Sequence, residues 1–217
     1  MAMETIDLRR ELRHLYATKP GRFELVDVPE LTYLSIGGRI ETGHGPSDSP
    51  GFEAALQALY GLAYTLRFTL KKRAERPIDF PVLPLQGQWW LDGGDFDLSH
   101  PDNWEYRLLI PVPDRIEPVD VAAALAGLAK KRGDSPELER LRLVRFAEGL
   151  CAQVLHLGPY ATEPATLAGL SAFLAGHGLA DLVGLRGGRH HEIYLGDPRR
   201  AAPEKLRTIL RHPVAAA

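Results

Sequence analysis

Glu192 is the residue whose type and setting point most directly to chemistry. It stands in the run 190-HHEIYL-195, which has the apolar and aromatic pattern of a β-strand. A carboxylate on a central strand is costly to bury unless it is paired or used. Four alternatives follow: exposure to solvent, a salt bridge to an arginine such as Arg107 or Arg189, attraction of a cationic or electron-poor ligand, or general-base activation of water.

Aromatic side chains are the strongest local signal around this carboxylate. Trp89 and Trp90 are neighbours in 86-QGQWWL-91, and adjacent strand residues point to opposite faces, so only one of them faces any given side. Tyr194 shares a strand face with Glu192. With other rings these could line a cage for a planar ligand, although core packing is the alternative for each ring alone. The candidate ligand-binding residues are Tyr64, Phe68, Trp89, Trp90, Trp104, Tyr106, His156 and Tyr194.

Several other reactive residues suggest no site of their own. Cys151 is the only cysteine, which excludes an intramolecular disulfide and a cysteine-based zinc site. Its apolar neighbours indicate an inert core thiol. The triplet 190–192 lacks H-x-H or H-E-x-x-H spacing, so no metal is expected. Glu148, before Gly149, is predicted to lie at a bulge and turn toward the pocket. No phosphate-binding glycine loop or G-x-S-x-G motif occurs, so no cofactor is expected.

Composition describes an ordinary globular chain. It has 217 residues, a formal net charge of −2, 45% hydrophobic and 25% charged residues. Without a basic arm or a block of like charge, nothing points to a nucleic acid partner or an anionic membrane surface. No apolar run approaches the roughly 20 residues that a membrane span needs, and residues 1–20 do not read as a signal peptide. We therefore expect a cytoplasmic protein.

The elements that must position these residues follow from periodicity and capping. Residues 4–17 could form one amphipathic helix, and 23–28 and 31–36 alternate as strands around Pro29. Ser49 and Pro50 start a long helix to about residue 72. The remaining predicted elements are strands at 83–91 and 104–112, a helix at 117–131, a strand at 141–158 broken near 148–149, a helix from Thr162 to about 176, and strands at 189–196 and 206–212. The loop 92–103 could act as a lid.

The order of elements repeats. Residues 23–112 and 141–213 each read as strand, glycine-containing turn, capped helix and two further strands. One such unit leaves a sheet face and edge unfinished, and pairing two units completes it. We therefore predict an α+β fold in which tandem β-α-β-β repeats form one antiparallel sheet with the helices on one face. A ligand cleft is expected between the halves. Residues 1–18 are predicted to be a lead-in, and residues 19–214 the domain.

Five segments together resemble the GyrI-like small-molecule-binding family, in its stand-alone branch without a DNA-binding domain. The most specific are 148-EGLCAQVLHLGPYATEPATL-167 and 190-HHEIYLGDPRRAAPEKLRTILRHPV-214. The others are 28-VPELTYLSIGG-38, 52-FEAALQALYGLAYTLRF-68 and 84-PLQGQWW-90. The resemblance implies a GyrI-like, SOUL-like architecture with an acidic residue in the cleft, which falls on Glu192.

The resemblance also implies an activity, since that branch includes cyclopropanoid cyclopropyl hydrolases, which open the cyclopropane of DNA-alkylating compounds. Their aromatic cage is carried over to Tyr64, Trp90, Trp104 and Tyr160, with Trp89 as the alternative to Trp90. Glu192 and Tyr160 are then the candidate catalytic residues, the first as a base on water and the second as a donor to the developing oxyanion. Non-catalytic binding or sequestration of aromatic or cationic compounds is the alternative function. The sequence leaves the oligomeric state open.

Overall fold

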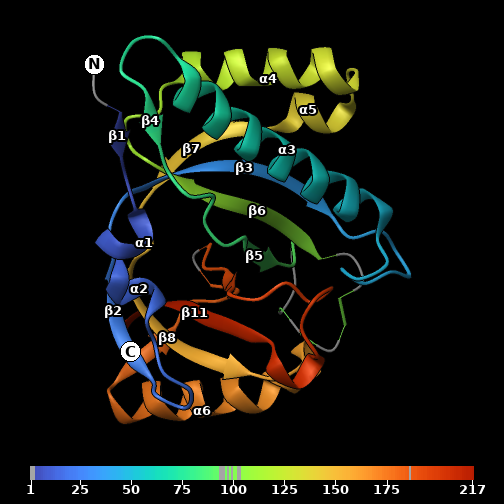
Figure 1. Ribbon diagram of the computed structural model, residues 1–217. Coiled ribbons are helices and arrows are strands. Elements are labelled where there is room, and N and C mark those ends of the chain that lie inside the picture. Colours follow the sequence, from blue (N-terminus) through green and yellow to red (C-terminus); the bar gives the residue numbers. More distant parts are fainter. Residues whose placement is uncertain (1–2, 93–95, 97, 99, 102–103, 186) are drawn as a thin grey trace.

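A nine-stranded antiparallel sheet dominates the fold (Figure 1). The computed structural model describes residues 3–92, 96, 98, 100–101, 104–185 and 187–217, and the count of strands refers to these. The strand order is β2-β8-β11-β10-β5-β6-β3-β7, with β9 paired to β11. The strands are β2 (Glu24–Val28), β3 (Leu31–Arg39), β5 (Gln86–Trp90), β6 (Glu105–Val112), β7 (Arg142–Phe146), β8 (Gly149–Leu157), β9 (Leu179–Asp181), β10 (His190–Tyr194) and β11 (Arg207–Ala216).

The sheet curves back on itself because, at two places, a strand from one end of the sheet continues along the chain into a strand at the other end. β2 leads into β3 past Pro29, and β7 leads into β8. The two runs stay in one antiparallel register, with Val28 opposite Gly149 and Leu31 opposite Phe146. Since β3 also pairs with β6 and β8 also pairs with β11, the hydrogen-bonded path returns to its start. The predicted breaks at Pro29 and near Gly149 are confirmed, and Gly149 has φ of 68°, a conformation that favours glycine.

The two main helices cover the outer face of this curved sheet. Figure 1 shows α3 over the side formed by β3 and β6, and α6 over the side formed by β8 and β11. Leu59, Leu62 and Leu66 of α3 pack in one core with strand residues such as Leu34 and Leu108. The predicted α+β class, with one antiparallel sheet and helices on one face, is confirmed. The helices are α3 (Pro50–Lys72), α4 (Pro118–Arg132), α5 (Pro136–Arg140) and α6 (Glu163–Gly176), with 3-10 turns η1 (Tyr160–Thr162) and η2 (Pro203–Lys205).

The amino-terminal segment differs from the single helix predicted for residues 4–17. Glu4–Thr5 forms β1, which pairs in parallel with β4 (Ile78–Asp79). Two one-turn helices follow, α1 (Leu8–Glu11) and α2 (Arg13–Tyr16), and Leu12 between them leaves helical geometry with ψ of 34°. The break turns Leu15 and Tyr16 into the apolar cluster on the inner face of the sheet, where both are buried. No helix in the described part of the chain is long and apolar enough to cross a bilayer.

Candidate functional site

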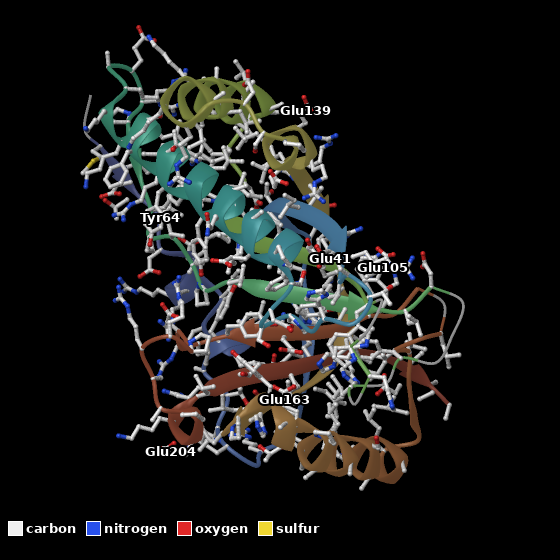
Figure 2. All side chains as sticks on the ribbon, turned by 90° about the vertical axis from the view of Figure 1, so that its right-hand side faces the viewer. Glu41, Tyr64, Glu105, Glu139, Glu163 and Glu204 are labelled. Atoms are coloured by element: carbon white, nitrogen blue, oxygen red, sulfur yellow. The ribbon has the colours of Figure 1, made fainter. Side chains whose placement is uncertain are left out.

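A large open groove of about 2350 Å³ lies on the outer face, where α3 and α6 flank β5 and β10. Tyr64 and Glu163 stand on its two sides, on α3 and at the start of α6 respectively (Figure 2). Its aromatic lining comes from both halves of the chain, as the predicted cleft between the halves requires. The aromatic lining residues are Phe52, Tyr60, Tyr64, Phe68, Trp89, Trp104, Tyr160 and Tyr194.

Glu192 lies on the floor of the groove, in the middle of β10, and is only 6% exposed. Its register partner on β5 is Gly87, which has no side chain to cover it. A Cβ at Gly87 would lie 2.8 Å from Trp89 Nε1 and 2.9 Å from the Tyr194 hydroxyl, so this position needs glycine. Trp89 Nε1 donates to the Tyr194 hydroxyl at 3.2 Å. Burial, then the nearby Glu192 carboxylate, raises the pKa of Tyr194, which stays protonated as a donor.

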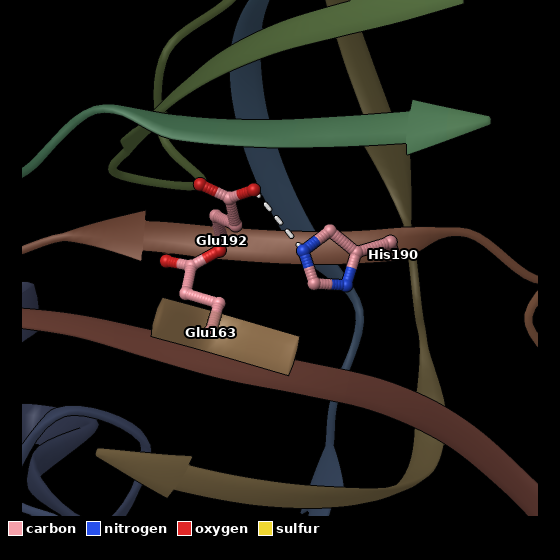
Figure 3. A group of neighbouring side chains, drawn as sticks. All are labelled: Glu163, His190 and Glu192. Carbon is pink, nitrogen blue, oxygen red and sulfur yellow. Dashed lines mark hydrogen bonds and ion pairs between the residues drawn. The ribbon is translucent and has the colours of Figure 1, made fainter. Parts of the chain in front are cut away.

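Glu163 is the second carboxyl group of the floor. It is 2% exposed, and its Oε1 is buried without a hydrogen-bond partner among the described residues. Figure 3 shows its side chain reaching from α6 toward Glu192. Burial, together with the charge of Glu192, raises the pKa of Glu163 to about 10. Two adjacent buried carboxyls do not both ionise at neutral pH, and the raised pKa of Glu163 keeps its carboxyl group neutral.

Glu192 is also the first member of a chain of hydrogen-bonded side chains. Its Oε1 lies 3.0 Å from His190 Nε2 (Figure 3). His190 Nδ1 lies 2.7 Å from His212 Nε2, and His212 Nδ1 lies 2.6 Å from Asp181 Oδ2. His190 is fully buried, and Phe96 stacks on its ring with centroids 5.5 Å apart. The groove carboxylate is thereby connected to a side chain on β9, at another part of the surface.

A cation has a candidate ligand set in the same place. Glu163, His190 and Glu192 each offer a ligand atom, and these atoms lie within 4.8 Å of one another. However, both ring nitrogens of His190 are already engaged, and Nδ1 faces another imidazole rather than the carboxylate or carbonyl that usually orients a metal-bound histidine. A shared proton fits this arrangement better than a resident metal ion. The expectation of no metal stays a prediction.

The comparisons with known proteins agree with this architecture. The sequence profile of the GyrI-like small molecule binding domain matches residues 99–215. The chain belongs to the GyrI-like family. An uncharacterized conserved protein from Listeria innocua is 37% identical with a TM-score of 0.88, the match covering 97% of this chain and 100% of that one. A hydrolase from Listeria innocua is 35% identical with a TM-score of 0.84, again covering 97% and 100%.

More distant likenesses concern the fold alone. The C-terminal domain of EcmrR is 12% identical with a TM-score of 0.53, the match covering 90% of this chain and 98% of that domain. At such identity only the GyrI-like fold is shared. No curated protein matches the chain.

Seven of the predicted site residues of this GyrI-like chain line the groove. Six are aromatic, and two of those, Tyr64 and Phe68, are about half exposed on α3. Trp89 and Trp104 are buried in the floor, with ring centroids 5.5 Å apart. Tyr160 meets Tyr194 edge to face at 6.0 Å. The seven are Tyr64, Phe68, Trp89, Trp104, Tyr160, Glu192 and Tyr194.

Three other predicted site residues lie outside the groove lining. Trp90 points to the sheet face opposite Trp89, where the Arg189 guanidinium lies 3.8 Å from its ring centroid. Tyr106 is 1% exposed and packs edge-on against Phe52 under α3. His156 is buried beside α6, with Nδ1 2.8 Å from Thr166 Oγ1. Strand alternation accounts for Trp90, and close helix packing for the other two.

Three further sequence predictions have different outcomes. Neither Arg107 nor Arg189 pairs with Glu192, because each guanidinium lies over a ring. Burial raises the pKa of the Cys151 thiol to about 12, as expected for an inert core cysteine. The predicted lid spans residues 92–103, of which 93–95, 97, 99 and 102–103 lie outside the described residues. The lid stays a prediction.

Glu148 points away from the groove, contrary to prediction. It lies on the inner face of the sheet, with Oε1 2.8 Å from His191 Nδ1 and Oε2 accepting from Arg211 at 3.4 Å. Burial alone would raise its pKa, but the charges and hydrogen bonds of His191 and Arg211 hold the pKa of Glu148 at about 2. Gln86 completes the cluster, 3.0 Å from His191 Nε2. The inner face therefore carries a buried ion pair with its own polar partners.

Proposed function

We propose that this protein binds bulky, flat aromatic compounds in the groove and hydrolyses them, with Glu192 as the base that activates water. The observation that carries the proposal is a buried carboxylate on the floor of an aromatic groove, beside a neutral carboxyl group. The Listeria innocua relatives that are described as hydrolases support hydrolysis. The proposed substrate class is cyclopropanoid DNA-alkylating compounds, so the reaction is a detoxification. Cytoplasmic location stays an expectation.

Binding uses the rings on the walls and floor. Tyr64 and Phe68 on α3 face solvent with about half of their surface, which leaves ring area available for stacking on a planar compound. Trp89 and Trp104 provide the floor beneath it. The groove is larger than most small-molecule pockets, which hold about 300–1,000 Å³, and so suits a substrate of several fused or linked rings.

The chemical step adds one water molecule across a strained carbon–carbon bond. The substrate class is a spiro-cyclopropyl dienone, and the water oxygen attacks the ring methylene. The carbon–carbon bond breaks, and its electron pair enters the dienone ring, which turns the carbonyl oxygen into a phenolate. Glu192 accepts the proton of the attacking water. Tyr160, whose pKa is raised first by burial and then by the charge of Glu192, donates a hydrogen bond to the phenolate oxygen. A proton from solvent then yields the phenol.

Non-catalytic sequestration is the second candidate function. The same rings and carboxylate would hold an aromatic or cationic compound without reaction, because stacking and charge attraction need no chemical step. The observation in its favour is the openness of the groove, since Tyr64 and Phe68 stand half exposed at its wall. Product formation distinguishes the two functions.

The test is incubation of the purified protein with a yatakemycin-type cyclopropanoid, with water addition followed by mass spectrometry. Glu192→Gln keeps the size of the side chain and removes the base, so turnover should fall at least about 100-fold while binding changes little. Glu139→Gln is the matched control, since Glu139 is exposed on α5, away from the groove (Figure 2). Full turnover by Glu192→Gln would refute the role of Glu192. Saturable Trp quenching without product would support sequestration.

A further inference from the structure

The chain from Glu192 to Asp181 holds three protons when all of its hydrogen bonds are formed. Three hydrogen bonds join Glu192, His190, His212 and Asp181, and each hydrogen bond needs one proton. Four groups with three protons carry one net negative charge. When Glu192 holds a proton, both imidazoles are protonated at Nδ1 and the charge is on Asp181. When Asp181 holds the proton, both are protonated at Nε2 and the charge is on Glu192.

We propose that these four side chains form a proton relay, which takes the proton that Glu192 accepts in the groove and delivers it to solvent at Asp181. The inference rests on the proposed hydrolysis. The step is a shift of three protons, each along one hydrogen bond: from Glu192 to His190 Nε2, from His190 Nδ1 to His212 Nε2, and from His212 Nδ1 to Asp181 Oδ2. No covalent bond between heavy atoms changes. Asp181 then loses its proton to water, which leaves both carboxylates ionised and both imidazoles protonated at Nε2. The imidazole protons return to Nδ1 by ring rotation before Glu192 passes on the next proton.

The relay connects a buried carboxylate in the groove to a partly exposed carboxylate outside it. Glu192 is 6% exposed and faces the space that a bulky ligand would fill, so its proton has no free path to water while product is bound. Asp181 is not part of the groove lining, and its side chain is 32% exposed. Between them His190 is fully buried and His212 nearly so. The proton therefore leaves at β9, outside the groove lining.

The surroundings of His212 favour its neutral imidazole over a trapped cation. Burial, and then the neighbouring His190, lowers the pKa of His212, although Asp181 and Glu192 oppose that shift. Burial would raise the pKa of Asp181, but its hydrogen bond and charge interaction with His212 outweigh burial and lower it. The remaining titratable neighbours of Glu192 are Glu163 from α6, Tyr160 from η1 and Tyr194 from β10. All three hold their protons at neutral pH, so they do not compete as acceptors.

The first test needs no turnover and uses NMR of the full chain. Ring ¹⁵N shifts report which nitrogen of each histidine is protonated, and the ¹³C shift of the Glu192 carboxyl reports its titration. Asp181→Asn removes the terminal acceptor and should change the ring shifts of His190, which Asp181 does not touch. It should also change the ¹³C shift of the Glu192 carboxyl at neutral pH, because the two ends of the chain are coupled. Unchanged His190 and Glu192 signals would overturn the relay.

Two further variants make that result specific. Asp114→Asn is the matched control, because Asp114 is an exposed aspartate that accepts one side-chain hydrogen bond, from Thr32 at 2.7 Å, far from the relay in sequence. It should leave the His190 and Glu192 signals unchanged. His212→Gln keeps hydrogen-bonding groups but interrupts proton transfer, and should reproduce the effect of Asp181→Asn.

The second test applies once turnover is measured. Asp181→Asn should lower kcat about tenfold with KM within twofold, and small buffer acids and bases should restore part of the rate. If the wild type forms no product, the proposed hydrolysis fails and the NMR coupling still decides the relay. If the wild type turns over and Asp181→Asn has the same kcat and the same NMR signals, the relay fails and the hydrolysis stands.

Discussion

Glu163 and Glu192 present carboxyl oxygens within 4.8 Å of each other, from the start of α6 and the middle of β10. Both side chains are almost fully buried, so two negative charges there would repel strongly through a medium of low polarity. A single shared negative charge removes that repulsion. Because Glu163 is held neutral, the pair carries at most one negative charge at the floor of the groove.

The first prediction concerns how stability depends on pH. The folded-state pKa of Glu163, about 10, lies above its usual value of 4.5. The stabilisation linked to its proton is complete below pH 4.5 and is lost as pH rises toward 10. Glu163→Gln cannot lose a proton, so it should be more stable than the wild type at pH 9, by about 1 kcal/mol or more. Urea unfolding at pH 5 and pH 9 measures the difference.

A matched glutamate separates this effect from general changes in charge. Glu139 is exposed on α5, and Glu139→Gln should lower stability equally at both pH values or not at all. If Glu163→Gln shows the same loss of stability between pH 5 and pH 9 as the wild type, Glu163 is ionised in the folded protein at neutral pH.

The second prediction distinguishes the two adjacent tryptophans. Trp89 lines the floor of the groove, whereas Trp90 lies on the opposite face under Arg189. An aromatic ligand in the groove should quench Trp89 by contact, so Trp89→Phe should lose about half or more of the ligand-induced quenching. Trp90→Phe is the control and should keep the quenching and the affinity. Equal losses in both variants would mean that the ligand binds elsewhere.

The tryptophan pair also shows which features of the site the sequence alone predicts and which it does not. Alternation along a strand requires that only one of Trp89 and Trp90 faces the groove, but it does not say which. That choice depends on the register of β5 between β6 and β10, which sets Gly87 opposite Glu192. Capping and periodicity, by contrast, are local, and they correctly predict α3 from Ser49 and Pro50.

The residues that sequence analysis missed are those whose role depends on long-range contact. Glu163 is one of several glutamates at a helix start, a common position, and only the approach of α6 to β10 makes it unusual. His190, His212 and Asp181 come from three strands, so no residue spacing in the sequence predicts their contact.

The helix α5 was missed although Ser135 and Pro136 form an ordinary helix start. The division into a lead-in at 1–18 and a domain at 19–214 stays a prediction.

The third prediction concerns the ion pair on the inner face. Arg211 is 2% exposed and is a partner of Glu148, so Arg211→Met leaves a buried carboxylate without its guanidinium. Removal of one partner of such a pair should lower the free energy of unfolding by about 3 kcal/mol at pH 7. Adding Glu148→Gln should recover much of the loss, because the uncompensated charge is then gone. Denaturant unfolding of the single and double variants measures this, and simple additivity would contradict it.

The same pair predicts behaviour in acid. The folded-state pKa of Glu148, about 2, lies below its usual 4.5. The stabilisation linked to its ionised form is present above pH 4.5 and is lost as pH falls toward 2. Glu148→Gln should therefore lose less stability than the wild type between pH 5 and pH 3. An identical acid profile in both proteins would exclude Glu148 as a source of acid sensitivity.

The fourth prediction uses the glycine opposite Glu192. A Cβ at Gly87 would come within 2.9 Å of both Trp89 Nε1 and the Tyr194 hydroxyl, closer than these side chains tolerate. Gly87→Ala should therefore separate Trp89 from Tyr194, break their 3.2 Å hydrogen bond and weaken binding of an aromatic ligand about tenfold, with a loss of about 1–3 kcal/mol in stability. Gly176→Ala, where a Cβ meets no atom within 4 Å, should leave binding unchanged. Calorimetric titration and urea unfolding give both quantities, and unchanged affinity in Gly87→Ala would mean that the Trp89–Tyr194 contact does not shape the site.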